Sequence, residues 1–370
     1  MSQFQTSKNR ITSTRLVAAG SNPADFELTE GDILVAVERF AFTANNVTYG
    51  AVGHQIGYWQ FFPPHLTADD DADWGIVPVW GFARIVASRN PDLQEGERLY
   101  GYLPIANYLQ IKPTNLSPER LMDGASHRKQ LPPVYNNYDR LGSGLGDSEV
   151  ENFRALLKPL YVTSFCLCDA LQQESYYSAD QVVIVSASSK TAIGLAYGLS
   201  QLTGKRPEIV GLTSDANVAF VQSTGLYDRV LGYGALDRLA NRPSVLVDMS
   251  GNRAVLGQVH ALLGDNMRYC HNVGLTHWDD SVTKNDPKAG SIIQERSAMF
   301  FAPSHIQNRA AEWGAVVFNQ KADAFLAAAT EHASTWMQVR EIHGLEAFSK
   351  VYDAVVGGDM TPSEGLIVSP

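Results

Sequence analysis

Residues 181–211 read QVVIVSASSKTAIGLAYGLSQLTGKRPEIVG, and this stretch decides the fold. Residues 182–185 form a continuous apolar run, which is typical of a parallel strand buried on both faces. A turn of small residues follows, then apolar residues at helical spacing up to Gly204, where a left-handed C-cap is expected. The stretch ends in a second apolar strand. This order predicts the first βαβ unit of a dinucleotide-binding fold, with a pyrophosphate site at the turn.

The composition of the 370-residue chain is globular and leaves room for two domains. Hydrophobic residues make up 45% and charged residues 18%, which argues against disorder. The net charge of −10 argues against a general binder of nucleic acid or of anionic membranes. The first ten residues lack the apolar region of a secretory leader, and Cys166, Cys168 and Cys270 form neither a disulfide framework nor a zinc motif. We therefore expect a cytoplasmic protein.

The chain changes character near residue 151. Before this point it is rich in strands and loops, and we expect strands at 33–37, 77–86 and 98–102. After it, a helix ends at Pro159, a second helix carries residues 165–171, and strands alternate with helices up to about residue 302. A long helix from 308 to about 333 then precedes a final strand–helix–strand set.

Five further segments stand in an informative order. They are ILVAVERFAFTANNVTYGAVG (33–53), VPVWGFARIVAS (77–88), EGERLYGYLPIANYLQIKP (95–113), LKPLYVTSFCLCDAL (157–171) and GLEAFSKVYDAVVGGDMTPSEGLIVSP (344–370). The series resembles the zinc-free quinone- and enoyl-reductase branch of the medium-chain dehydrogenase/reductase superfamily. The segment GLTSDANVAFVQSTGLYDRVLGY (211–233) is similar to a little-characterised subgroup of it.

The resemblance implies an α/β protein of two domains. A Rossmann-type doubly wound parallel sheet would occupy residues 156–305. A β-rich, GroES-like catalytic domain would combine residues 1–155 with 306–370. Members often form homodimers through the edge of the cofactor domain's sheet, here expected near residues 279–302.

The resemblance also bears on metal binding. In the zinc-dependent relatives a Cys and a Gly-His-Glu motif hold the metal. The Cys position corresponds to Asn45, and the His and Glu positions fall near Trp80 and Gly81. Because Trp and Gly cannot ligate zinc, we expect no catalytic zinc.

The turn at 186–194 reads SASSKTAIG and retains one glycine of the usual fingerprint, Gly194. Gly194 can serve the close helix–strand packing for which the third glycine is used. Hydroxyl groups can partly replace the other glycines by donating hydrogen bonds to phosphate oxygens, and the lysine adds a positive charge. The alternative is an eroded turn that no longer binds nucleotide. The candidate cofactor ligands here are Ser188, Ser189, Lys190, Thr191, Ile193 and Gly194.

The end of the second strand bears on the choice of nucleotide. An NAD-specific fold ends this strand with an acid that binds the ribose 2′-hydroxyl. Here Thr213 and Ser214 stand at the tip and Asp215 arrives late, which favours NADPH and keeps NADH open. Asn217 and Tyr233 are further candidate phosphate contacts.

Two later loops would line the nicotinamide by resemblance, together with residues 301–302. Both follow strands at the carboxyl edge of the predicted sheet, where ligands bind in open α/β folds. Asp248, which precedes the first of them, could equally be an ordinary turn residue. The candidates on these loops are Met249, Ser250, Gly251, Val273 and Gly274.

Hydride transfer without zinc requires a hydrogen-bond donor for the oxygen charge and a proton donor. Asn45 and Thr48 resemble the family's Asn and Asp positions, although threonine cannot act as an acid. Tyr49 could donate a proton, but a tyrosine on an apolar helix face can also belong to the core. His54 and Tyr58 begin an aromatic loop, HQIGYWQFFPPH (54–65), that we expect to overhang the substrate cleft.

These residues predict a zinc-independent, NADPH-dependent oxidoreductase that reduces an activated C=C or C=O bond. The aromatic residues suggest a small apolar or aromatic substrate. Two alternatives remain open: a lyase or hydrolase that uses the same scaffold without redox chemistry, and a nucleotide-binding protein without turnover. Fold alone cannot separate the three.

Overall fold

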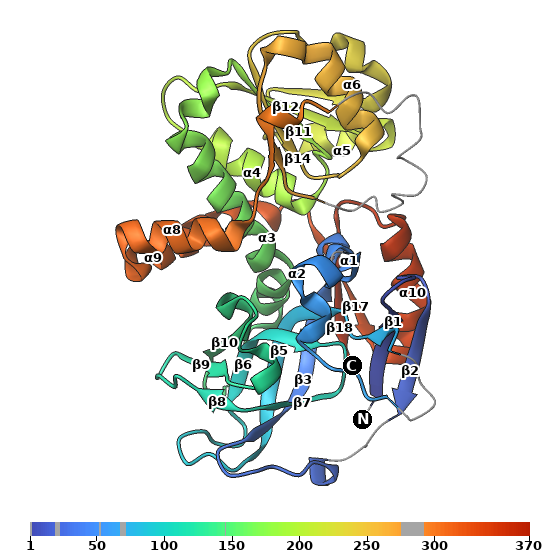
Figure 1. The fold of residues 1–370 in the computed structure, drawn as a ribbon, viewed down its shortest axis with the longest axis vertical. Helices are drawn as coiled ribbons and strands as arrows, with labels where there is room; N and C mark the ends of the chain where they lie inside the picture. The colour runs from blue at the N-terminus through green and yellow to red at the C-terminus, as the bar shows by residue number, and fades with distance from the viewer. Residues whose placement is uncertain (1, 19–22, 52, 67–71, 145, 275–291) are drawn as a thin grey trace. The chain divides into compact units, whose positions relative to one another are not determined.

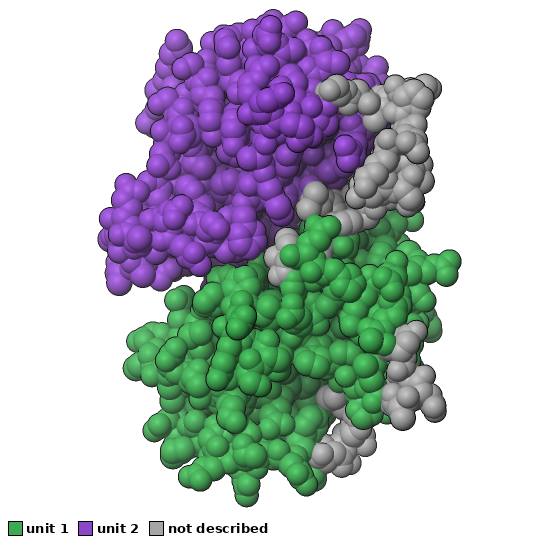
Figure 2. Space-filling view, in the orientation of Figure 1, with its two compact units in different colours: residues 1–156, 338–370 green, residues 157–337 purple. Residues whose placement is uncertain are grey.

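The computed structural model describes residues 2–18, 23–51, 53–66, 72–144, 146–274 and 292–370 (Figure 1). The chain forms two compact units, which Figure 2 shows in different colours. Unit 1 comprises Met1–Leu156 and Gln338–Pro370, and unit 2 comprises Leu157–Met337. Residues 306–337 lie in unit 2, whereas the sequence analysis assigned them to the other domain. The reason is apolar packing, because Phe318 and Ala322 share a buried cluster with Cys166.

Unit 2 is built on a parallel sheet of six strands. The strand order is β13-β12-β11-β14-β15-β16, and every pairing is parallel. This is the doubly wound arrangement that the sequence predicts. The strand order reverses between β11 and β14, and folds of this kind bind ligands at the carboxyl ends of the strands at such a point. The strands are β11 (Gln181–Val185), β12 (Glu208–Thr213), β13 (Arg229–Gly232), β14 (Ser244–Asp248), β15 (Met267–Asn272) and β16 (Ser297–Met299).

Alternation along β11 explains its unbroken apolar run. Val182 and Ile184 belong to one buried cluster, while Val183 and Val185 belong to another on the opposite face. Successive side chains of a strand point to opposite faces, so a strand covered on both sides needs apolar residues throughout. The first cluster includes residues of α3 (Ser148–Gln173) and α4 (Lys190–Ser200), and the second includes residues of α6 (Arg253–Leu263).

Two helix boundaries differ from the sequence prediction. The expected pair of helices before β11 is one continuous helix, α3, which contains Pro159. Proline removes one backbone hydrogen bond, but the flanking Leu156, Leu157 and Tyr161 are almost fully buried and hold the helix in place. The expected long helix from 308 is instead α8 (Ala302–Trp313) and α9 (Ala315–Ala333), separated by Gly314 with φ 84°.

Unit 1 is rich in strands, as expected. Its larger sheet runs β17-β18-β3-β5-β6-β10-β9-β8, with β7 paired to β3, and a smaller sheet runs β2-β1-β4. The strands are β1 (Ser2–Ser7), β2 (Thr14–Ala18), β3 (Ile33–Phe42), β4 (Trp74–Gly75), β5 (Pro78–Ser88), β6 (Arg98–Pro104), β7 (Tyr108–Ile111), β8 (Pro113–Thr114), β9 (Arg120–Asp123), β10 (Asn137–Arg140), β17 (Gln338–His343) and β18 (Glu364–Ser369).

The helices of unit 1 are short apart from the last. Phe348 and Tyr352 of α10 (Leu345–Gly357) pack against the rings of Phe4 and Phe42. The helix α1 (Ala44–Ala51) contacts β5 and is followed by α2 (Gly53–Ile56). In the part of the chain that the structure describes, no helix is both long enough and apolar enough to cross a membrane.

Candidate functional site

The turn between β11 and α4 is closed by its own backbone and leads into a capped helix. Ser186 has φ 60°, a left-handed conformation that is uncommon for residues other than glycine. The Ser189 N–H donates to the Ser186 carbonyl at 2.9 Å and closes the turn. The Ser189 hydroxyl then caps α4 by accepting from the Ala192 N–H at 3.3 Å. The N-terminus of α4, which favours anions, therefore starts at the carboxyl edge of the sheet.

The Ser188 hydroxyl accepts two hydrogen bonds from other side chains. Its hydroxyl oxygen is within 3.2 Å of both the Thr213 hydroxyl and the Asn217 amide nitrogen, which can donate to it. A hydroxyl has two lone pairs and one proton, so an oxygen that accepts twice keeps its proton for a ligand. The structure thus brings three predicted cofactor residues, Ser188, Thr213 and Asn217, into one polar cluster.

Tyr233 lies against the same turn. Its hydroxyl oxygen accepts a hydrogen bond from the Ser186 N–H at 3.2 Å. Burial raises the pKa of Tyr233 to about 12, so the phenol stays neutral at physiological pH and can still donate its proton. Lys190 and Thr191 form the first turn of α4, and the Thr191 carbonyl accepts from the Ser164 hydroxyl of α3 at 2.8 Å.

Gly194 permits close packing between two helices. A β-carbon at this position would lie 2.6 Å from Cδ1 of Tyr161 and 2.7 Å from the Ser164 hydroxyl oxygen. Both neighbours belong to α3, whereas the sequence analysis expected helix–strand packing. The Ile193 side chain is completely buried in the core, so that residue can offer a ligand only its backbone.

The tip of β12 carries an acid that is turned toward β13. Asp215 is exposed, and its carboxylate accepts from the Gly234 N–H at 3.3 Å. Ser214 is the N-cap residue of the short helix at Asp215–Asn217, but its side chain makes no capping hydrogen bond. The last residue of β12 is therefore Thr213, and the acid stands two positions beyond the strand.

Asp248 organises the loop after β14. Its carboxylate accepts from the Ser250 N–H at 2.9 Å, the Ser250 hydroxyl at 2.7 Å and the Gly251 N–H at 3.1 Å. Its backbone carbonyl accepts from the N–H groups of Val273 and Gly274 at 2.8 and 3.1 Å. Asp248 is thus a buried residue at the end of β14 that joins the two loops predicted to line the nicotinamide.

Met249 and Gly274 lie in direct contact at these loops. A β-carbon on Gly274 would overlap the Met249 backbone, so only glycine fits there. Met249 is itself 5% exposed and packs in the core.

Much of the sheet edge expected for the dimer, residues 279–302, lies outside the described residues.

The catalytic candidates of unit 1 gather in part around Tyr49. The rings of Tyr49 and Tyr58 lie 4.5 Å apart between centroids, and the Tyr49 hydroxyl oxygen accepts from Nε1 of Trp80 at 3.3 Å. Asn45 also hydrogen-bonds to Tyr49, which lowers the pKa of the Tyr49 phenol. Burial has the larger effect, so the pKa of Tyr49 is raised. The hydroxyls of Tyr58 and Tyr135 are 2.8 Å apart, and burial raises the pKa of both phenols. These tyrosines form a neutral, hydrogen-bonded cluster.

The remaining two candidates do not join this cluster. The Thr48 hydroxyl donates to the Ala44 carbonyl of its own helix at 3.3 Å, and His54 is exposed on α2. Aromatic rings of the loop that was expected to overhang a cleft are buried, since Phe61 and Phe62 are 1% and 3% exposed. These rings pack against other aromatic rings of unit 1, among them Tyr102.

Trp80 and Gly81, which the resemblance placed at zinc-ligand positions, are held by packing and hydrogen bonding. Trp80 donates its indole N–H to Tyr49, and a β-carbon on Gly81 would collide with the backbone of Arg39 and Phe40. Within the described residues, no three His, Cys, Asp or Glu side chains are arranged to hold a metal ion.

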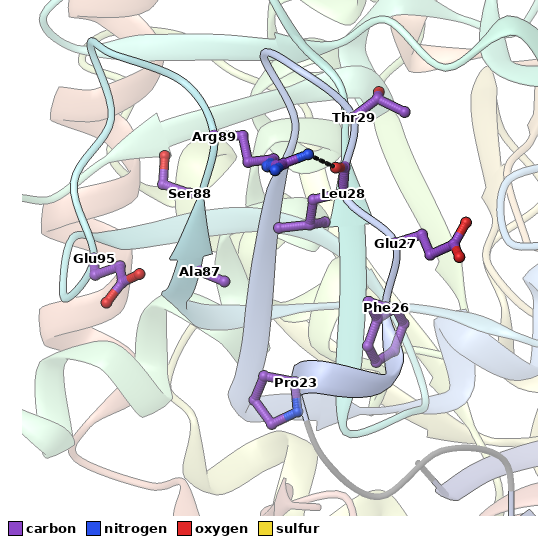
Figure 3. A pocket seen from close by; sticks show the side chains of 9 residues that line it. All are labelled: Pro23, Phe26, Glu27, Leu28, Thr29, Ala87, Ser88, Arg89 and Glu95. Atoms are coloured by element: carbon purple, nitrogen blue, oxygen red, sulfur yellow. Dashed lines mark hydrogen bonds between the residues drawn. The ribbon is translucent and has the colours of Figure 1, made fainter.

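A surface pocket of about 600 Å³ lies elsewhere in unit 1 (Figure 3). It is formed by residues 23–29 and the end of β5, and Arg89 donates to the Leu28 carbonyl at its edge. Trp80 stands seven or more residues earlier on β5, which is about 23 Å at the rise of a strand. The pocket is therefore separate from the tyrosine cluster.

Sequence reasoning missed Tyr227 and Tyr135. The Tyr227 hydroxyl donates to the Ala187 carbonyl in the turn at 2.8 Å. Tyr135 completes the hydroxyl pair with Tyr58. Neither residue stands in a motif, and the one available signal for Tyr227 is its place just before β13.

Comparison with known proteins gives one family and many similar folds. Residues 40–361 match the family described as protein of unknown function (DUF2855). Among curated proteins, no sequence matches this chain. The crystal structure of CurA from Vibrio vulnificus in complex with NADPH is similar at 13% identity and a TM-score of 0.65, over 100% of this chain and 99% of that chain.

Two further solved structures have the same fold. The quinone oxidoreductase from Coxiella burnetii is 14% identical, with a TM-score of 0.54 over 100% of this chain and 99% of that chain. The yhdH oxidoreductase from Salmonella enterica in complex with NADP is 15% identical, with a TM-score of 0.52 over 100% of both chains. At these identities the likeness shows the fold, and it confirms the predicted Rossmann-type sheet with a β-rich second unit.

Proposed function

The chain belongs to the DUF2855 family, and we propose that it is a zinc-independent, NADPH-dependent oxidoreductase that reduces an activated C=C or C=O bond. The observation that carries this proposal is the turn between β11 and α4. It combines a left-handed residue, a capped helix N-terminus and the Ser188 donor at the point where the strand order reverses. Structures with this fold have been solved with NADPH and with NADP bound.

The donors at this turn fit a dinucleotide. A pyrophosphate needs several hydrogen-bond donors and a favourable dipole, and the start of α4 offers both. Ser188 keeps a proton for an oxygen of the ligand, and Lys190 places a cation at the first position of the helix. A bound nicotinamide would supply the hydride, while the protein supplies orientation and electrostatics.

NADPH is the better candidate of the two nucleotides. The residues around the β12 tip are hydroxyls and an amide, from Thr213, Ser214 and Asn217, which can bind a 2′-phosphate without repulsion. Asp215 opposes this choice, but its carboxylate is turned to the Gly234 N–H, which reduces its reach toward a ribose.

In unit 1 we assign the substrate chemistry to Tyr49 and Asn45. The Tyr49 oxygen accepts from Trp80, so its own O–H proton can be directed to an oxygen or carbon of the substrate. A neutral phenol suits this role, since burial raises its pKa. Asn45 would stabilise the developing negative charge on the substrate oxygen. The buried aromatic surroundings favour an apolar or aromatic substrate.

Titration with NADPH and NADH, followed by nicotinamide fluorescence, tests the cofactor assignment. We expect micromolar NADPH affinity, weaker NADH affinity, and weaker binding of both by Ser188→Ala. A panel of enones, quinones and aldehydes then tests turnover, with Tyr49→Phe expected to lose turnover while it still binds NADPH. If neither nucleotide binds the wild-type protein, the oxidoreductase assignment is wrong.

A nucleotide-binding protein without turnover is the second candidate. The observation in its favour is that Tyr49 and Tyr58 are 6% and 4% exposed and already hydrogen-bonded to other side chains. Tight NADPH binding without oxidation of NADPH across the whole substrate panel would favour this function. The proposal also includes a cytoplasmic homodimer, and equilibrium sedimentation of the purified protein tests the oligomeric state.

A further inference from the structure

We infer that Tyr227 and Tyr233 position the cofactor turn and take over the task that glycines perform in the usual fingerprint. This inference rests on the proposed nucleotide site and concerns how that site is shaped. Fingerprint glycines provide a left-handed backbone and room for close approach. Here Ser186 adopts φ 60° and Ala187 follows it, so both properties must come from the surroundings.

The two phenols hold successive residues of the turn. Tyr233 accepts from the Ser186 N–H at 3.2 Å, and Tyr227 donates to the Ala187 carbonyl at 2.8 Å. Tyr227 precedes β13 and Tyr233 directly follows it, so the two tyrosines stand at opposite ends of the same strand. Burial raises the pKa of each, so both phenols are neutral and each can give or accept as the turn requires.

Space for the turn comes from the neighbouring strand. A β-carbon on Gly211 of β12 would lie 2.9 Å from both the Ala187 Cβ and Cδ1 of Tyr227. The residue that lacks a side chain is therefore Gly211 in β12, and this leaves room for the methyl group of Ala187 in the turn. The Ala187 N–H donates to the Leu212 carbonyl at 2.9 Å, which ties the turn to the same strand. Together these contacts fix the backbone that leads to the phosphate donors.

This arrangement makes Tyr227 and Tyr233 positioning residues for a pyrophosphate. They act through the turn, so their loss should weaken every ligand that carries a pyrophosphate by a similar factor. A residue that bound the 2′-phosphate directly would affect NADPH alone. The two roles therefore predict different patterns of affinity.

The experiment compares the affinities of NADPH, NADH and ADP for the full-length wild type, Tyr227→Phe and Tyr233→Phe. Each variant removes one hydrogen bond to the turn, and we expect the Kd of all three ligands to rise about three- to tenfold. Adding Ser186→Gly to Tyr233→Phe should return the Kd to within about twofold of wild type, because glycine adopts the left-handed backbone without support. Tyr197→Phe, in the middle of α4, is the matched control and should bind as wild type does.

Three results would overturn the inference. The first is unchanged binding in both phenylalanine variants of a protein whose wild type binds NADPH. The second is a loss confined to NADPH, which would assign Tyr233 to the 2′-phosphate. The third is a failure of Ser186→Gly to rescue Tyr233→Phe. Tyr233 is only partly buried, so Tyr233→Phe can carry the test should Tyr227→Phe fold poorly. Absence of nucleotide binding in the wild type would instead refute the proposed function itself, and the inference with it.

Discussion

Replacing Gly194 with alanine tests the packing that sets the start of α4. The new β-carbon would lie 2.6 Å from a ring carbon of Tyr161 and 2.7 Å from the Ser164 hydroxyl, about 1 Å inside normal contact. Neither neighbour can move away easily, because Tyr161 is 1% exposed and the Ser164 hydroxyl donates a hydrogen bond to the Thr191 carbonyl. We therefore expect α4 to move away from α3.

The magnitude follows from three opposing contributions. Overpacking in a core costs about 1–3 kcal/mol, and a strained bond between Ser164 and Thr191 costs about 1 kcal/mol. Alanine gains about 1 kcal/mol over glycine in helix propensity. The free energy of unfolding should fall by about 2 kcal/mol, which lowers the melting temperature of a unit of this size by about 4–8 °C.

Thermal unfolding and an NADPH titration measure the two consequences of Gly194→Ala. Gly198→Ala, one turn further along α4, serves as the matched control. Its β-carbon would meet the outer edge of the Phe325 ring at 2.8 Å, and that ring is only partly buried and can rotate. We expect the Gly198 variant to be milder in stability and neutral in binding. If Gly194→Ala melts as high as wild type and binds NADPH equally well, the reasoning about this contact is wrong.

Three further predictions concern charge. Glu151→Leu should lower the free energy of unfolding by about 2 kcal/mol in a denaturant titration, because Arg98 is 3% exposed and loses a two-pronged partner, although it keeps its hydrogen bond to Glu38. Adding Arg98→Met should recover much of that loss. Burial lowers the pKa of His260 and His271 to about 4. Between about pH 6.5 and pH 4 the unfolded chain therefore binds more protons than the folded chain, and acidification through that window should lower the melting temperature. The melting temperature should fall less steeply in His271→Phe, which lacks one of these two groups. Asp215→Asn should improve NADPH affinity over NADH affinity by about two- to fivefold in parallel titrations, and an unchanged ratio would place the 2′-phosphate elsewhere.

The sheet of unit 2 could be predicted because its information is local. Each central strand is a short apolar run, and the order of strands and helices along the chain limits the topology to few choices. The helix boundaries were harder to predict from the sequence. Whether a helix continues through Pro159 depends on how deeply the neighbouring residues are buried. The burial of Phe61 and Phe62 could not be predicted from the sequence either. An aromatic segment has the same sequence pattern whether it covers a cleft or packs in a core.

The candidate site shows what a sequence motif leaves out. A fingerprint records glycines, but the physical requirements are a left-handed backbone at one residue and free space beside the next. In this chain the backbone at Ser186 is supported by Tyr233, and the space beside Ala187 is provided by Gly211 in another strand. Gly211 and Tyr233 lie 24 and 47 residues along the chain from the turn positions that they serve. A degraded motif is therefore weak evidence for a lost site, and the Ser186→Gly rescue measures directly whether neighbouring residues have taken over the task of the glycines.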